Sequence, residues 1–234
     1  MDNLRKIIVA IDGYSACGKS TTAKSVASIL GYKYFDSGAM YRATTLHFLD
    51  NHVALTNPRE LSRALGQINI SFKVNLRNET EVYLNGLNVE KEIRQMRISE
   101  NVSQISTIKA VREAMVQQQR KLGREKGVVM DGRDIGTVVF PEAELKLFMT
   151  ADIMVRAVRR QRELLDAERL VDLDSVIENI RHRDEIDTSR SESPLRQASD
   201  AIVLDTTYVT IDEQVDEVVR LAVSMSLNGV PEKA

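Results

Sequence analysis

Cysteine is nearly absent from this sequence, in which Cys17 is the single one among 234 residues. One cysteine excludes an internal disulfide and favours a reducing compartment. No apolar run is long enough to span a bilayer, and residues 1–6 lead into the first apolar run without the pattern of a signal peptide. The net charge of −2 and the lack of a lysine-rich tail argue against a nucleic-acid-binding surface. We therefore expect a cytoplasmic protein that binds neither membranes nor nucleic acids.

Short apolar segments recur along the chain and alternate with segments of helical periodicity. With 43% hydrophobic residues, the chain can bury a substantial core. Parallel strands need helical crossovers, and strands buried on both faces appear as continuous apolar runs. The pattern predicts an α/β fold with a five-stranded parallel sheet flanked by helices. Core strands are predicted at residues 7–11, 127–130, 145–149 and 201–205, with a further short strand at 32–35. Helices are predicted at 20–30, 39–49 and 213–227.

A different pattern occupies residues 65–89. Apolar residues alternate with polar ones at Ile68, Ile70 and Phe72, and turns are predicted at residues 76–79 and 85–86. This pattern indicates a small antiparallel β insertion in the α/β chain. Residues 93–123 are then predicted to be largely helical.

The stretch from Gly13 to Thr21 matches the phosphate loop G-x-x-x-x-G-K-[ST], between a predicted strand and a predicted helix as that motif requires. Glycines let the backbone curl so that its N–H groups cradle a diphosphate, and the helix N-terminus adds partial positive charge. Lys19 can reach the β- and γ-phosphates, and the Ser20 hydroxyl can bind Mg²⁺. A nucleoside triphosphate site is therefore predicted. Its members are Gly13, Tyr14, Ser15, Ala16, Cys17, Gly18, Lys19, Ser20 and Thr21.

Two acidic residues follow predicted strands. Asp36 could accept Mg²⁺-bound water or cap the next helix, and the two roles are equally open. Arg42 in the first turn of that helix opposes the helix dipole unless it binds an anion. Asp131 ends another buried strand, where a second Mg²⁺-organising carboxylate belongs. The polar stretch from Asp131 to Thr137 is costly for a simple turn and is interpreted as functional.

Lysine is absent between Lys146 and Lys233, where every basic residue other than histidine is arginine. Guanidinium groups bind phosphates bidentately, as ammonium groups do not. About half of these arginines are expected to pair with nearby acids on the same helices. The others predict a lid over the transferring phosphate, at about residues 158–190. The ten arginines are Arg156, Arg159, Arg160, Arg162, Arg169, Arg181, Arg183, Arg190, Arg196 and Arg220.

Four stretches together resemble the bacterial cytidylate kinase family over nearly the whole chain, the β insertion included. They are the phosphate loop, residues 36–42 (Asp-Ser-Gly-Ala-Met-Tyr-Arg), residues 131–141, and Arg183-Asp184 with Asp187 and Arg190. Tyr14 departs from the family, which usually has proline there. The resemblance implies a P-loop nucleoside monophosphate kinase fold: one domain over residues 1–234, with an inserted monophosphate-binding subdomain at about 63–103 and the lid.

The resemblance also implies transfer of the ATP γ-phosphoryl group to CMP or dCMP, in pyrimidine nucleotide metabolism, by a monomer that uses Mg²⁺. The predicted catalytic residues are Lys19, Asp131, Arg133 and Arg190, and the predicted metal-binding residues are Ser20, Asp36 and Asp131. The acceptor phosphate would be held by Arg42, Arg133 and Arg190. The cytosine edge would be read by Ser103, Arg112 and Asp134, and the ribose contacted by Arg183 and Asp187, with Ser37 lining the same pocket. Arg156 would stack on adenine, and Arg160 would meet the ATP phosphates.

Two alternatives remain open at this stage. The first is another kinase on the same fold, acting on UMP, shikimate or dephospho-coenzyme A; the β insertion and the Asp-Gly-Arg-Asp block at residues 131–134 argue against it. The second is a non-catalytic nucleotide-binding regulator. Such a regulator would be expected to lack Lys19, Asp131 or the lid arginines, and all are present.

Overall fold

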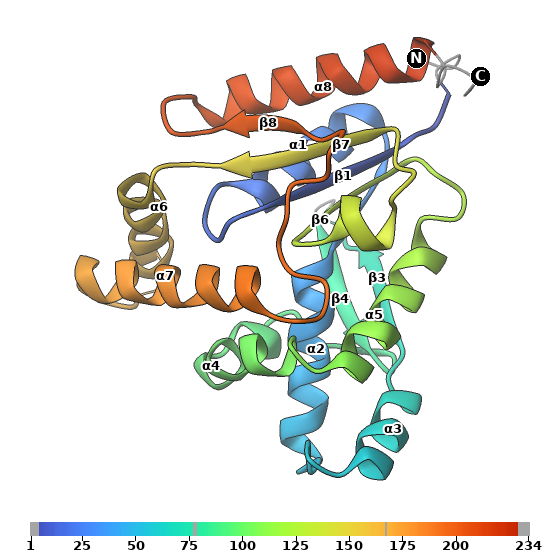
Figure 1. Cartoon of the computed structure of the whole chain (residues 1–234), viewed down its shortest axis with the longest axis vertical. Helices are drawn as coiled ribbons and strands as arrows, with labels where there is room; N and C mark the ends of the chain where they lie inside the picture. The colour runs from blue at the N-terminus through green and yellow to red at the C-terminus, as the bar shows by residue number, and fades with distance from the viewer. Residues whose placement is uncertain (1–4, 77–78, 167, 229–234) are drawn as a thin grey trace. The chain divides into compact units, whose positions relative to one another are not determined.

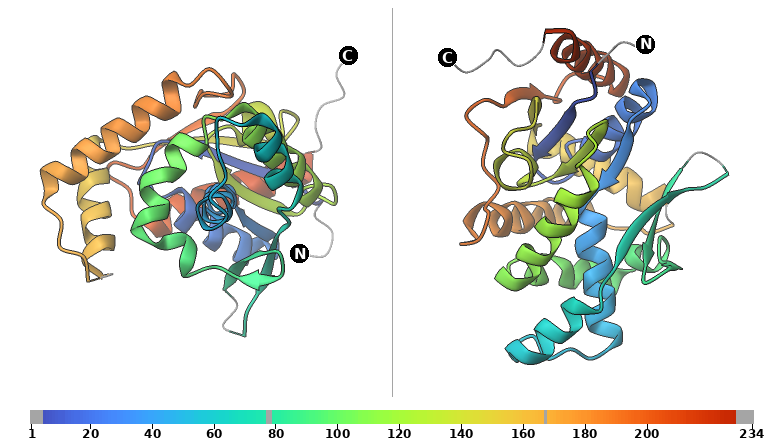
Figure 2. Two further views of the ribbon diagram at one scale, coloured as in Figure 1. Left: turned by 90° about the horizontal axis from the view of Figure 1, so that it is seen from below. Right: turned by 90° about the vertical axis from the view of Figure 1, so that its right-hand side faces the viewer.

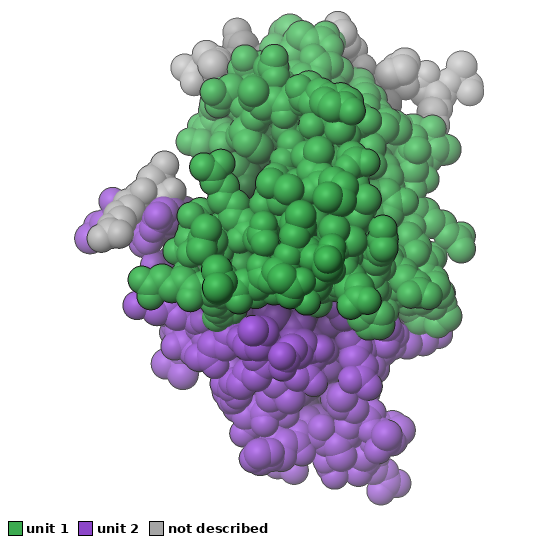
Figure 3. All heavy atoms as spheres, turned by 90° about the vertical axis from the view of Figure 1, so that its left-hand side faces the viewer, with its two compact units in different colours: residues 1–34, 125–234 green, residues 35–124 purple. Residues whose placement is uncertain are grey.

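The computed structural model describes residues 5–76, 79–166 and 168–228. The chain divides into two compact units, residues 1–34 with 125–234, and residues 35–124 (Figure 3). Arg77 and Asn78, at the centre of the first predicted turn of the β insertion, lie outside the described residues. Residues 1–4, which belong to the N-terminal segment predicted to lack a signal peptide, also lie outside the described residues.

Among the described residues, five strands form one sheet in the order β2-β6-β1-β7-β8 (Figure 1). Strand β1 pairs in parallel with β6 and β7, and β7 pairs in parallel with β8. Consecutive residues of β1 such as Val9 and Ala10, which point to opposite faces of the sheet, are both fully buried, as expected for a central strand. The predicted α/β fold with a five-stranded parallel sheet is confirmed. Its strands are β1 (Ile8–Gly13), β2 (Lys33–Asp36), β6 (Val128–Gly132), β7 (Leu145–Thr150) and β8 (Ile202–Asp205).

Helices α1 (Lys19–Leu30) and α8 (Ile211–Asn228) pack together on this sheet. Val26 from α1 and Val218 from α8 are fully buried in one apolar cluster with Val129 of β6 and Leu147 of β7. Helix α1 begins within the phosphate loop, at Lys19, so this packing fixes the direction of its N-terminus. No helix in the described ranges is long and apolar enough to cross a membrane.

Helices α6 (Ile153–Asp166) and α7 (Leu173–Ser189) pack against each other, as Figures 1 and 2 both show. Ala157 of α6 is fully buried in a small cluster with Val176 and Ile180 of α7. Asp172 is the N-cap of α7, and its side chain accepts the backbone N–H of Ser175 at 2.9 Å. These two helices contain most of the arginines of the lysine-free segment.

The second unit has its own core, in which Met40, Phe48, Ile98 and Met115 are buried. Its three-stranded antiparallel sheet confirms the predicted β insertion. The segment predicted to be largely helical is helical, but it breaks after Arg94 and after Ile105. The elements are α2 (Ser37–Asp50), α3 (Pro58–Gly66), β3 (Ile70–Val74), β4 (Thr80–Leu84), β5 (Leu87–Asn88), a short 3-10 helix (Glu92–Arg94), α4 (Met96–Ile105) and α5 (Lys109–Leu122).

Two features of the fold differ from the sequence prediction. Strand β8 is not a core strand: it ends the sheet, and its Ile202 and Val203 are 38% and 49% exposed. An apolar edge strand and a central one have the same sequence pattern. Helix α3 was not predicted, although Asn57 caps it by accepting the N–H of Arg59 at 3.1 Å and Pro58 occupies its first turn.

Candidate active site

The phosphate loop joins the end of β1 to the start of α1. Gly13 has φ +149°, and a Cβ there would lie 2.0 Å from the carbonyl oxygen of Met149 on β7, so only glycine fits. Gly18, with φ +93°, is the N-cap of α1 and provides no side-chain hydrogen bond to its first amides. N–H groups at a helix start that lack internal partners are suited to bind an anion.

Lys19 is folded back onto this loop and is only 6% exposed. Its Nζ donates to the carbonyl oxygen of Tyr14 at 2.6 Å and lies 3.7 Å from Sγ of Cys17. Burial lowers the pKa of Lys19, and the positive charge of Arg133 lowers it further. The lysine is thus held inside the loop that is expected to receive phosphate.

Ser20 and Asp131, two of the predicted metal-binding residues, are in direct contact. The Ser20 hydroxyl donates to Oδ2 of Asp131 at 2.7 Å, and the hydroxyl of Tyr34 donates to Oδ1 of the same carboxylate at 2.8 Å. The prediction that Asp131 ends a buried strand holds, since it lies in β6 and is 4% exposed.

Hydroxyl and carboxylate oxygens are ligands that Mg²⁺ accepts. Within the described residues, no group of three or more His, Cys, Asp or Glu side chains could hold a metal by itself. A single carboxylate with a hydroxyl fits an ion that takes its remaining ligands from substrate phosphates and water. The donor set at Ser20 and Asp131 therefore suits Mg²⁺ brought with a nucleotide.

Arg133 follows β6 and reaches both the phosphate loop and α7. Its Nη2 donates to Oγ of Ser15 at 3.2 Å, and its Nε donates to Oδ2 of Asp187 at 2.6 Å. Burial alone would lower the pKa of Arg133, but the Asp187 carboxylate raises it above its ordinary value. Burial has the opposite effect on an acid and would raise the pKa of Asp187. The positive charges of Arg133 and Arg190 nevertheless hold that pKa below its usual range.

Two further predicted residues lie near the end of α7. Arg190 donates from Nη1 to Oδ1 of Asp187 at 3.3 Å and from Nη2 to the carbonyl oxygen of Ser193 at 2.8 Å. Arg190 is the C-cap of α7, whereas Arg183 lies within that helix and is half-buried. The structure thus brings Arg133, Asp187 and Arg190 together beside the phosphate loop.

Arg156 of α6 contacts the phosphate loop and α7. Its Nη1 donates to Oδ2 of Asp184 at 2.5 Å and to the carbonyl oxygen of Ser15 at 3.3 Å. Its guanidinium also lies 5.4 Å from the ring centroid of Tyr14, which has an edge-on contact with Phe148. Arg156 is 7% exposed and supports the loop from within the protein.

Arg160 has a different environment, on α6. Its Nη1 pairs at 2.9 Å with Glu163, and its side chain is 38% exposed. This is one of the arginine–acid pairs within a helix that the lysine-free segment led us to expect.

Asp184 and Asp12 are functional candidates that sequence reasoning missed. Asp184 Oδ1 accepts the backbone N–H of Ser15 at 3.2 Å, which ties α7 to the phosphate loop. Asp12 accepts two backbone amides of the loop after Asp134. Their positions were informative, because Asp184 adjoins Arg183 in a motif stretch and Asp12 directly precedes Gly13.

The second unit contains most of the other predicted site residues. Asp36 is the N-cap of α2: its Oδ1 accepts the N–H of Ala39 at 2.8 Å, and its Oδ2 pairs with Nη2 of Arg42 at 2.8 Å. Burial would raise the pKa of Asp36, but Arg42 and the cap hydrogen bond lower it. The helix begins at Ser37, so Arg42 is in its second turn and not in the first as predicted, and the anion beside it is Asp36.

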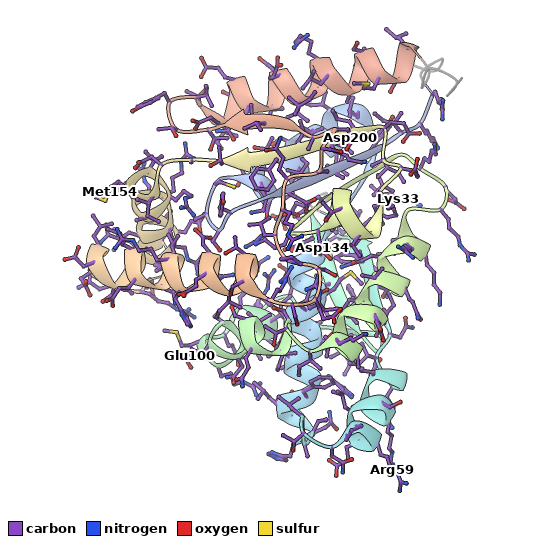
Figure 4. The ribbon with its side chains drawn as sticks, in the orientation of Figure 1. Lys33, Arg59, Glu100, Asp134, Met154 and Asp200 are labelled. Carbon is purple, nitrogen blue, oxygen red and sulfur yellow. The ribbon has the colours of Figure 1, made fainter. Side chains whose placement is uncertain are left out.

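The residues predicted to read cytosine lie on several elements. Arg112 of α5 is 3% exposed, lies 5.3 Å from the ring centroid of Tyr41, and donates to the carbonyl oxygen of Ser106 at 3.1 Å. Ser103 is half-buried on α4. Ser37, which was predicted to line the same pocket, is buried in the first turn of α2. Asp134 belongs to the first unit and follows β6, where Figure 4 labels it.

Proteins of known family share most of this sequence. The sequence model of the family described as Cytidylate kinase matches residues 9–224. A cytidylate kinase of Cytophaga hutchinsonii is 60% identical over 94% of this chain and 94% of its own. One from Bacteroides fragilis is 50% identical over 90% and 94%. A solved structure of an uncharacterized protein from Eubacterium ventriosum, 11% identical over 94% of this chain and 99% of its own, has a TM-score of 0.52, which shows a shared fold alone. The family match and the close relatives show that the chain belongs to the cytidylate kinase family.

Proposed function

We propose that this protein transfers the γ-phosphoryl group of ATP to CMP or dCMP, forming ADP and CDP or dCDP. The observation that carries the proposal is the contact between Arg133 and Ser15 at 3.2 Å. Arg133 is the arginine assigned to the acceptor phosphate, and Ser15 belongs to the loop assigned to the donor phosphates. That contact supports a site in which the two phosphates are next to each other.

This reaction needs no general base. The nucleophile is an oxygen of the CMP phosphate, which is ionised near neutral pH. Catalysis can therefore depend on alignment and on neutralising charge. Lys19 would neutralise the γ-phosphoryl group as it transfers, and Arg133, Arg190 and Arg42 would hold the acceptor phosphate.

Ser20 and Asp131 would hold Mg²⁺, with Asp36 as a further carboxylate. When bound, Mg²⁺ neutralises charge on the β- and γ-phosphate oxygens. The hydrogen bond between Ser20 and Asp131 keeps both oxygen donors in place before nucleotide arrives. Arg156 and Arg160 would contact ATP.

Recognition of the acceptor would depend on hydrogen-bonding pattern. Cytosine offers an amino donor at N4 and an acceptor at N3, whereas uracil offers an acceptor at O4 and a donor at N3. Asp134 and Ser103 would accept from the amino group, and Arg112 would donate to N3 and O2. Arg183 and Asp187 would contact the ribose, with Ser37 in the same pocket.

We also propose a division of the enzyme into subdomains, an oligomeric state and a cellular compartment. Residues 63–103 would form the monophosphate-binding subdomain, and residues 158–190 a lid that excludes water from the transferring phosphate. The enzyme would act as a monomer in the cytoplasm, in pyrimidine nucleotide metabolism.

A coupled assay of ADP release over CMP, dCMP, UMP and AMP tests the function. We expect CMP and dCMP to give turnover well above the rate with ATP alone, and UMP and AMP to give little. Equal turnover with UMP would support a broader pyrimidine kinase. ADP release that does not depend on the acceptor would contradict phosphoryl transfer to a nucleotide.

A further inference from the structure

Asp12, at the carboxyl end of β1, holds the loop that carries Asp134. Its Oδ1 accepts the backbone N–H of Ile135 at 2.8 Å, and its Oδ2 accepts that of Gly136 at 2.7 Å. The residue is 4% exposed. One buried carboxylate therefore uses both of its oxygens on two consecutive amides of another segment.

These two amides begin a π-helical turn, η2 (Ile135–Val139), whose N-cap is Asp134. The first N–H groups of a helical turn lack internal acceptors, and an Asp at the N-cap ordinarily accepts one of them. Here the side chain of Asp134 makes no such cap bond. Asp134 joins the turn through its carbonyl oxygen, which accepts the N–H groups of Val138 and Val139 at 2.9 and 3.1 Å.

Asp12 thus does the capping in place of Asp134. We propose that Asp12 is a positioning residue for base recognition: it caps the turn from β1 and so fixes the backbone position of Asp134, the residue assigned to the acceptor base. The inference rests on the proposed function, in which Asp134 accepts from the cytosine amino group. Since Asp12 directly precedes Gly13, the same residue joins the base-reading loop to the phosphate loop.

Burying the charged form of Asp12 is unfavourable, which indicates that the carboxylate has a specific role. Burial raises the pKa of Asp12 to about 7; the two amides lower it, the charge of Asp134 raises it, and that of Lys19 lowers it. The stem of Lys146 on β7 packs on the same turn, since a Cβ at Gly136 would lie 3.2 Å from its Cδ. An asparagine would fill this space without burying charge, but it has one acceptor oxygen and could not accept both N–H groups.

The primary variant is Asp12→Asn, which keeps the side-chain size but can accept only one of the two N–H groups. Glu144→Gln is the matched control, because Glu144 is also a buried acid that accepts a β1 amide, that of Ile8 at 3.0 Å. For Asp12→Asn we expect faster hydrogen exchange at Ile135 and Gly136, and KM for CMP raised about ten-fold or more with KM for ATP little changed, as for a lost hydrogen bond to a charged group. The CMP-to-UMP ratio of kcat/KM should fall. Glu144→Gln should change neither exchange at these amides nor the ratio.

A double-mutant cycle tests whether Asp12 acts through Asp134. If it does, Asp12→Asn should change the CMP-to-UMP ratio little further in an Asp134→Ala background, because the group being positioned is already gone. Additive effects would overturn the proposal. A ratio that changes in Asp134→Ala but not in Asp12→Asn would overturn the proposal alone. A ratio unchanged in Asp134→Ala would overturn it together with the assignment of Asp134 to the base.

Gly136→Ala is a second variant should Asp12→Asn fail to fold. A Cβ there would lie 3.5 Å from Oδ2 of Asp12 and 3.2 Å from the flexible stem of Lys146. We expect a milder change of the same sign in the CMP-to-UMP ratio. An unchanged ratio together with faster exchange at Ile135 and Gly136 would overturn the proposal, because the turn would then be loosened without effect on base selection.

Discussion

The guanidinium of Arg133 donates from Nε to Oδ2 of Asp187 at 2.6 Å. The other oxygen of that carboxylate accepts Nη1 of Arg190 at 3.3 Å. Asp187 therefore holds side by side two arginines assigned to the acceptor phosphate, which would otherwise repel each other. Two adjacent guanidinium groups match the oxygens of a phosphate.

Asp187→Asn should weaken this pair. The neutral amide removes a charge-assisted hydrogen bond that is partly buried, so Arg133 and Arg190 lose their common anchor. We expect kcat/KM for CMP to fall about ten- to a hundred-fold. Glu185→Gln is the control, since it removes an exposed acid from the same helix. Equal kinetics for the two variants would contradict the role of Asp187.

Lys19→Met should remove the charge while filling much of the space of a side chain that is 6% exposed. If the ammonium group neutralises the transferring γ-phosphoryl group, kcat should fall by about 10² or more, as for loss of a main electrostatic contact in other enzymes. The melting temperature should change little. Turnover near that of the wild type in a folded variant would remove Lys19 from the mechanism.

Asp134→Ala should change which base is accepted. In the proposed site its carboxylate attracts the cytosine amino group and repels O4 of uracil, and unmatched buried polar groups cost about 1–3 kcal/mol each. We expect kcat/KM to fall steeply for CMP and less for UMP, so that their ratio collapses. A parallel decline for both substrates would mean that Asp134 does not read the base.

The titration of Asp12 should appear in stability. Its pKa is raised from 3.8 to about 7, chiefly by burial. Between these values the folded protein binds a proton that the unfolded chain has released, so the free energy of unfolding falls as pH rises and levels above pH 7. The full contribution is roughly 4 kcal/mol at about 1.4 kcal/mol per pKa unit.

Urea unfolding of the wild type and Asp12→Asn at pH 5, 6, 7 and 8 measures this contribution. The difference between the two proteins should shrink or change sign as pH rises, because only the wild type has the ionising group. Burial lowers the pKa of His47, but His47 is present in both proteins and its contribution cancels in the comparison. A constant difference would show that Asp12 does not titrate there.

The main sheet and the phosphate loop could be predicted because their signals are local. Apolar runs mark β1, β6 and β7, and the spacing of Gly13, Gly18 and Lys19 marks the loop. The edge position of β8 could not be predicted, because it depends on which strand pairs with which. The pairing of Arg42 with Asp36 could not be predicted either, because it depends on the residue at which α2 begins.

Contacts across the fold were the least predictable part of the site. Asp12 and Gly136 are separated by 124 positions, and Asp184 and Ser15 by 169. Each pair is joined by a single hydrogen bond to a backbone amide, which has no sequence signature. The motif residues were therefore found from the sequence, whereas the residues that hold the motifs in place required the structure.

The most direct test of the account is ³¹P NMR of the purified protein with equimolar ATP and CMP in the presence of Mg²⁺. We expect the α- and β-phosphate signals of CDP to grow together with those of ADP, in equal amounts, while inorganic phosphate stays near zero. ADP that accumulates with inorganic phosphate and without CDP would contradict it, because the γ-phosphoryl group would then be transferred to water and not to CMP.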